Sequence, residues 1–166
     1  VLVVCGSQQT LDLASKLFID PGTEILVEAP TYLAALQSFQ LFGADCITVP
    51  QEADGPELEA LRERLQQHKP AFAYLIPTFQ NPSAVRYSEA KRDAVAALLD
   101  EFNVTLIEDE PYRELVFDAG SAGRYGATWN FVGKRHFGGD FVHRQAEGFA
   151  TERVTYRADQ HHAVLL

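Results

Sequence analysis

Four short segments of this sequence contain residues whose types could contact a ligand. Residues 6–10 form a small turn with hydroxyl groups that opens a helical pattern, where free backbone N–H groups attract phosphate. Residues 30–32 end on an aromatic ring at the entrance to a helix. Residues 77–83 are too rich in proline for a helix and contain Asn81, whose amide could bind a ligand. Residues 108–112 begin with three consecutive carboxylates and end on a tyrosine.

Each segment also has an ordinary structural explanation when it is taken alone. Ser7 suits a helix N-cap, and an Asn-Pro pair such as Asn81-Pro82 suits a turn. Three carboxylates are typical of a solvated edge or a divalent-metal site. However, the apolar run at residues 104–107 predicts that a carboxylate pointing inward is buried, and a buried carboxylate is expected to need a cationic partner.

An alternation of strand and helix patterns positions these segments. Apolar runs predict five strands, at residues 1–5, 24–29, 46–49, 71–76 and 104–107. Apolar residues at helical spacing predict four helices between them, beginning near residues 7, 31, 56 and 88. This order predicts an α/β fold with three layers, α/β/α, and a mostly parallel sheet. The four segments then meet at the carboxyl ends of the strands, where such folds bind ligands.

Together, these loops resemble the large domain of the fold-type I pyridoxal-phosphate-dependent enzymes, the aspartate aminotransferase superfamily. The resemblance is greatest to the 2-aminoadipate and kynurenine-type branch of the class I/II aminotransferases and to the aminotransferase-like domains of certain transcription regulators. It rests on the motifs at residues 29–32, 79–82 and 108–112 and covers residues 1–118. It implies amino transfer between an amino acid and a 2-oxo acid, in an intact protein that is a homodimer.

The resemblance also implies a cofactor, pyridoxal 5′-phosphate, and a role for each site residue. Asp109 is expected to pair with the pyridine nitrogen, which keeps the ring protonated and able to accept electrons. Glu108 and Glu110 are expected on the opposite face of the strand. The remaining cofactor-binding residues are Ser7 and Gln8 at the phosphate, Tyr32 stacked on the ring, and Asn81 and Tyr112 at the phenolic oxygen.

Two positions depart from the family pattern. Ala84 replaces the glycine that usually closes the turn after Asn81, a modest change if φ there is negative. The family also places a lysine that binds the cofactor covalently a few tens of residues after Asp109, in a serine-rich motif. Lys134 is the one lysine in that part of the sequence, and its neighbours lack the serines and the strand pattern. We therefore expect Lys134 not to be the cofactor lysine, although it is the single candidate for a catalytic one.

The character of the sequence changes near Gly120. The net charge of −9 divides into −11 for residues 1–120 and +2 for residues 121–166, and the second part contains four of the five histidines. We predict two regions: a partial cofactor-binding large domain at residues 1–118, and an atypical tail at residues 119–166 that is disordered or out of frame. Since the sequence has no methionine and begins on Val1 in an apolar run, we also expect a fragment.

Composition limits the other possibilities. The acidic balance argues against a nucleic-acid partner, no apolar run is long enough for a membrane helix, and we expect a cytoplasmic protein. Two hypotheses compete with an aminotransferase fragment. One is a non-catalytic module that binds the cofactor or forms a dimer. The other is a metal site formed by Glu108, Asp109 and the His161-His162 pair; no ligand spacing supports it, so no metal is expected.

Overall fold

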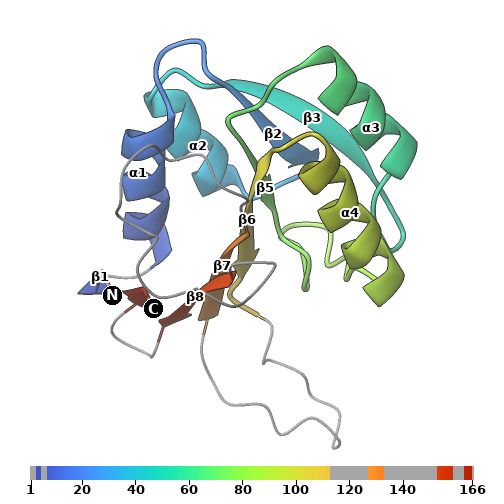
Figure 1. The fold of residues 1–166 in the computed structure, drawn as a ribbon. Coiled ribbons are helices and arrows are strands. Elements are labelled where there is room, and N and C mark those ends of the chain that lie inside the picture. Colours follow the sequence, from blue (N-terminus) through green and yellow to red (C-terminus); the bar gives the residue numbers. More distant parts are fainter. Residues whose placement is uncertain (1–2, 5–6, 113–126, 133–152, 159–162, 166) are drawn as a thin grey trace, which may run out of the picture.

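The computed structural model describes residues 3–4, 7–112, 127–132, 153–158 and 163–165. Within them the chain forms helices on both sides of one sheet (Figure 1). The helices are α1 (Ser7–Phe18), α2 (Leu33–Leu41), α3 (Leu58–Gln67) and α4 (Glu89–Glu101). The strands are β1 (Val3–Val4), β2 (Glu24–Ala29), β3 (Asp45–Glu52), β4 (Gly55–Pro56), β5 (Phe72–Leu75), β6 (Thr105–Glu110), β7 (Ala127–Val132), β8 (Arg153–Ala158) and β9 (Ala163–Leu165).

The sheet has a parallel block and an antiparallel remainder. Its strand order is β1-β9-β8-β7-β6-β5-β2-β3-β4. β3, β2, β5 and β6 are parallel neighbours, as predicted, and the other pairs among the described strands are antiparallel. The expectation of a parallel sheet was therefore wrong for β1, which pairs antiparallel with β9. Sequence patterns predicted no strand after residue 107, so the partners on that side of the sheet were missed.

Helices cover both faces of the parallel block, which confirms the three-layer prediction (Figure 1). Successive strand residues point to opposite faces. On one face α1 and α2 cover a buried cluster whose aromatic rings meet edge to face, with centroids 5.6 Å apart for Phe39–Phe72 and 5.4 Å apart for Phe39–Tyr74. On the other face α3 and α4 cover a mainly aliphatic cluster that includes Leu61 and Leu99. None of the helices described is long and apolar enough to cross a bilayer.

β6 is longer than the sequence predicts. The expected strand ended at residue 107, with the carboxylates in the loop after it; the observed strand continues through Glu110. It continues because neighbours bond it on both sides: Glu108 pairs with Leu75 of β5, and Asp109 and Glu110 pair with residues of β7. The three carboxylates therefore alternate between the two faces of a strand.

Three strands, β7 to β9, come from the segment predicted to be an atypical tail. β7 pairs with β6 over five residues, and β8 and β9 continue the sheet. The other residues of that segment, 119–126, 133–152, 159–162 and 166, lie outside the described part of the chain. The domain boundary at residue 118 stays a prediction.

Candidate functional site

The candidate site lies at one edge of the parallel block. β2, β5 and β6 are adjacent and point the same way, so their carboxyl ends share an edge. The loop from β2 to α2 contains Tyr32, the loop from β5 to α4 contains Asn81, and β6 ends on Asp109 and Glu110. Sequence positions far apart are thus brought to one place, as the parallel topology predicts.

The beginning of α1 lies at the same edge. α1 has 12 residues, or about 18 Å of helix, and a short turn at Asp20–Thr23 reverses the chain into the six residues of β2, about 20 Å of strand. Because the two elements are antiparallel and of similar length, the first turn of α1 ends near the carboxyl end of β2. Ser7 and Gln8 are in that turn, and Gln8 is exposed. The free backbone N–H groups of a helix start favour an anion there.

Asp109 is the central polar group of the site. Its side chain is buried, and its Oδ2 accepts a hydrogen bond of 2.5 Å from the hydroxyl of Tyr74. Its Oδ1 is also buried and has no hydrogen-bond partner in the part of the chain that the structure describes. Burial raises the pKa of Asp109 to about 7; the Tyr74 hydrogen bond opposes the rise, and the charge of Glu110 adds to it. Burial and the charge of Asp109 also raise the pKa of Tyr74, so its hydroxyl stays a donor.

The neighbours of Asp109 in β6 face the other layer. Ile107 belongs to the cluster under α1 and α2, as Tyr74 does, whereas Leu106 belongs to the cluster under α3 and α4. By alternation Asp109 faces α1 and α2, and Glu108 and Glu110 face away, as predicted. Asp109 has a phenol as its partner where a cation was expected.

Glu110 has a structural role that the sequence did not reveal. It is fully buried, and its Oε1 accepts hydrogen bonds from Arg92 Nη1 at 2.8 Å and Thr78 Oγ1 at 2.7 Å. Arg92 Nη2 also donates to the carbonyl of Pro77 at 3.1 Å and to Thr78 Oγ1 at 2.6 Å. These bonds attach α4 and the start of the β5–α4 loop to the end of β6.

The other predicted site residues are partly accessible. Tyr32 is half-buried, packs against the cluster under α1 and α2, and lies close enough to Tyr74 to raise the pKa of that phenol. Asn81 is half-buried, and Tyr112, just past β6, is 37% exposed. These three side chains are therefore accessible to a ligand. Lys134, His161 and His162 lie outside the described residues.

Sequence reasoning missed Tyr74 and Gln80, both buried, because each looked like part of an ordinary apolar strand or proline-rich loop. A usable signal was present for Tyr74. It is the polar-tipped residue in β5, the strand beside β6, and an inward carboxylate on β6 needs a donor from a neighbouring strand. No such signal exists for Gln80, whose contacts depend on how two loops fold.

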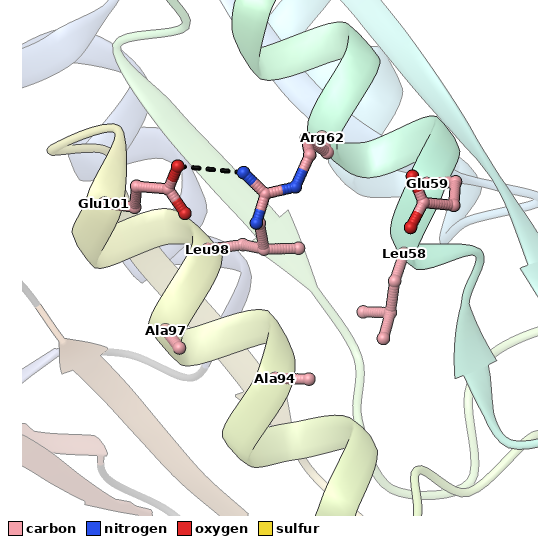
Figure 2. Close-up of a pocket in the computed structure, with 7 residues that line it drawn as sticks. All are labelled: Leu58, Glu59, Arg62, Ala94, Ala97, Leu98 and Glu101. Atoms are coloured by element: carbon pink, nitrogen blue, oxygen red, sulfur yellow. Dashed lines mark hydrogen bonds and ion pairs between the residues drawn. The ribbon is translucent and has the colours of Figure 1, made fainter.

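A hollow of about 290 Å³ lies elsewhere, between α3 and α4 on the face away from Asp109 (Figure 2). Its apolar floor is bordered by an ion pair of 2.8 Å between Arg62 and Glu101. The lining residues are Leu58, Glu59, Arg62, Ala94, Ala97, Leu98 and Glu101. None of the predicted site residues lines it, so it is separate from the candidate site.

Among the described residues, no three potential metal ligands form a group that could hold a metal ion.

The comparisons with known proteins agree with this geometry. Residues 1–137 match the model of the family described as aminotransferase class I and II. The chain belongs to this family. The resemblance inferred from the loops is thereby confirmed.

The family relatives are larger proteins. The chain is 44% identical over 117 residues to the 2-aminoadipate transaminase of Thermus thermophilus, covering 70% of the chain and 30% of the relative. It is 36% identical over 169 residues to aromatic-amino-acid aminotransferase 1 of Thermococcus litoralis, covering 99% of the chain and 40% of the relative. The chain thus spans about a third of the length of these relatives.

The fold agrees as well. The structure of the alpha-aminoadipate aminotransferase LysN from Thermus thermophilus, complexed with N-(5′-phosphopyridoxyl)-L-leucine, matches with a TM-score of 0.69 and 42% identity. The match covers 72% of this chain and 31% of that one. A kynurenine aminotransferase from Pyrococcus horikoshii matches with a TM-score of 0.68 and 36% identity, covering 76% of this chain and 35% of that one. The chain therefore has part of the aspartate-aminotransferase-like fold.

Proposed function

We propose that the protein containing this chain is a pyridoxal-phosphate-dependent aminotransferase, which moves an amino group between an amino acid and a 2-oxo acid. Family membership supports the reaction class. The observation that supports the cofactor most directly is the buried Oδ1 of Asp109, which has no hydrogen-bond partner among the described residues. A buried carboxylate oxygen left unpartnered is costly, and a protonated ring nitrogen is the type of donor that would satisfy it.

Pyridoxal 5′-phosphate, when bound, supplies a protonated pyridine ring that withdraws electrons from the α-carbon of a substrate. The residues of this chain would hold that ring in a fixed orientation. Tyr74 occupies Oδ2 of Asp109, so Oδ1 would be left to bind the ring nitrogen and keep it protonated. Tyr32 would stack on the ring, and Asn81 would bind its phenolic oxygen. Tyr112 would share that oxygen, and the phosphate would lie at Ser7 and Gln8.

A non-catalytic module that binds the cofactor or forms a dimer is the alternative. It is favoured because the three lysines in the described part of the chain lie away from Asp109. Lys91 forms an ion pair with Glu52 on the face away from Asp109, and Lys16 forms one with Asp12 on an exposed side of α1. Lys69 is exposed ahead of β5, at the opposite end of the strands.

Finer assignments belong to the same proposal. The named relatives support an enzyme of the 2-aminoadipate and kynurenine-type branch with amino acid and 2-oxo acid substrates. We infer a homodimer by analogy with the family. We infer no nucleic-acid partner from the acidic composition, and a cytoplasmic location without a membrane partner from the lack of an apolar run long enough for a membrane helix in the given sequence.

Cofactor binding by Asp109→Asn tests the proposal. We expect the unchanged chain to bind pyridoxal 5′-phosphate and Asp109→Asn to bind it at least about tenfold more weakly, because a hydrogen bond between charged groups is replaced by a neutral one. Asp93→Asn is the matched control, since Asp93 is exposed on α4. Titration by fluorescence, with circular dichroism to verify folding, measures both. Equal affinity of the two variants would contradict the proposed site.

A further inference from the structure

The two loops that present Tyr32 and Asn81 are joined by one buried side chain. Gln80 is only 1% exposed and precedes Asn81 in the β5–α4 loop. Its Nε2 donates a hydrogen bond of 2.6 Å to the carbonyl of Pro30, in the β2–α2 loop two residues before Tyr32. Fifty residues of sequence separate the partners, so this contact links two loops that are far apart in the sequence.

Gln80 also closes the turn that contains Asn81. Its Oε1 accepts hydrogen bonds from the backbone N–H of Ser83 at 2.8 Å and from the Ser83 hydroxyl at 2.6 Å. Its own backbone N–H donates to the carbonyl of Val85, and its carbonyl accepts from the N–H of Ala84. Asn81 therefore lies inside a turn that Gln80 closes with both its backbone and its side chain.

The surroundings favour a glutamine amide at this position. The Pro30 carbonyl requires a donor, and the Ser83 groups require an acceptor; an amide offers both from a single side chain. A glutamate of equal size would have no donor for Pro30, and it would lie near the buried carboxylate of Glu28, whose pKa burial raises and Gln80 helps to lower. Alanine would remove every side-chain bond of the junction.

From this junction we infer that Gln80 is a positioning residue for the cofactor. It sets the Tyr32 ring and the Asn81 amide relative to each other, so that one ligand ring is contacted by both. The inference deepens the proposed function and rests on it. Gln80 itself does not contact the ligand in this proposal, so it would act by positioning Tyr32 and Asn81.

The test compares pyridoxal 5′-phosphate affinity among variants of the full chain. We expect Gln80→Ala and Gln80→Glu each to weaken binding about tenfold, because a displacement of contacting groups by a fraction of an ångström is enough to lose a hydrogen bond. Val95→Ala is the control: Val95 lies on α4 and is buried on the other face of the sheet, and its truncation should lower stability without removing any hydrogen bond of Gln80. Its affinity for the cofactor should be unchanged.

A double-mutant cycle separates positioning from general stability. If Gln80 acts through Asn81, the loss caused by Gln80→Ala should be at least about threefold smaller when Asn81 is already alanine. Equal losses in both backgrounds, or no loss at all while Asp109→Asn still weakens binding, would overturn this inference alone. No binding by the unchanged chain would overturn the proposed function and this inference with it.

Discussion

Asp109 is an acid whose ionisation opposes folding. Burial raises its pKa from an ordinary 3.8 to about 7, so the folded chain holds this proton more tightly than the unfolded chain does. The contribution of Asp109 to stability is therefore complete below about pH 4 and is lost as the pH rises through about 7. We expect the free energy of unfolding of the unchanged chain to fall, relative to Asp109→Asn, by up to about 1.4 kcal/mol per pH unit in that range.

Urea unfolding of both chains between about pH 4 and pH 8 measures this difference. Glu28 also has a raised pKa because it is buried, but it is present in both chains, so its contribution cancels. Parallel stability curves for the two chains would show that Asp109 ionises freely, and that it is not the buried group described here.

At the residue scale, the sequence predicted which face of β6 each carboxylate points to, but it did not predict the hydrogen-bond partner of each carboxylate. Alternation along an apolar strand was enough to place Asp109 inward and Glu110 on the other face. The partners were not predictable, because Tyr74 is 35 residues from Asp109 and Arg92 is 18 residues from Glu110. Such pairs depend on the register of β5 against β6 and on where α4 crosses them, and neither can be read from one sequence.

The turn after Asn81 contains Ala84, whose φ the sequence could not predict. The alanine at position 84 was expected to be a modest change if its φ is negative, but its φ is +60°. A side chain in the left-handed region costs about 1–2 kcal/mol, and glycine avoids most of that cost. We expect Ala84→Gly to stabilise the chain by about 1 kcal/mol.

A control of opposite sign accompanies this substitution. Ala96 is exposed in the interior of α4, where glycine costs about 1 kcal/mol relative to alanine. Ala96→Gly should therefore destabilise the chain while Ala84→Gly stabilises it, as measured by midpoints of chemical unfolding. Destabilisation by both would mean that the turn does not hold Ala84 in the left-handed region.

Two arginine–carboxylate pairs of equal length distinguish a structural junction from a surface contact. Arg92–Glu110 and Arg62–Glu101 both measure 2.8 Å, but Glu110 is fully buried and Glu101 is exposed (Figure 2). Arg92→Met would leave a buried carboxylate without its cation and should cost about 3 kcal/mol. Arg62→Met should cost less than about 1 kcal/mol. Thermal unfolding of the two variants measures the contrast, and similar losses would contradict a junction at Glu110.

At the element scale, the parallel block was predictable because its strands are apolar runs separated by amphipathic helices. The extension of β6 and the place of β1 were not. Both depend on β7 to β9, which were not predicted as strands although apolar and polar residues alternate along β7 and β8. Alternation over six residues does not specify which neighbour a strand pairs with or in which direction.

For the whole molecule, the place of the site could be predicted from the sheet topology, and the family could be predicted from the combination of loops. No single loop was specific, since each has an ordinary explanation. Their specificity came from adjacency: β2, β5 and β6 are neighbours, so three unrelated loops must meet. The family model matches through residue 137, and the alignment with the Thermococcus litoralis enzyme covers 99% of the chain. Those matches continue past residue 118, where the tail was predicted to begin.

The lysines of the chain lead to the last prediction. Of the four, Lys16, Lys69 and Lys91 lie away from Asp109, so a covalent link to pyridoxal 5′-phosphate at the site is open only to Lys134. Because the neighbours of Lys134 lack the family motif, we expect the 166-residue chain to bind the cofactor reversibly. Borohydride should then fix no cofactor, and the absorbance should remain that of the free aldehyde.

Peptide mass mapping after borohydride treatment decides between the two outcomes. Incubation with pyridoxamine 5′-phosphate is the control, because that compound should bind the same site and has no aldehyde to react with a lysine. A phosphopyridoxyl group on Lys134, absent from Lys134→Ala, would contradict reversible binding. It would also assign Lys134 the catalytic role, because a lysine linked to the cofactor at the Asp109 site is placed to move protons at the α-carbon of a substrate.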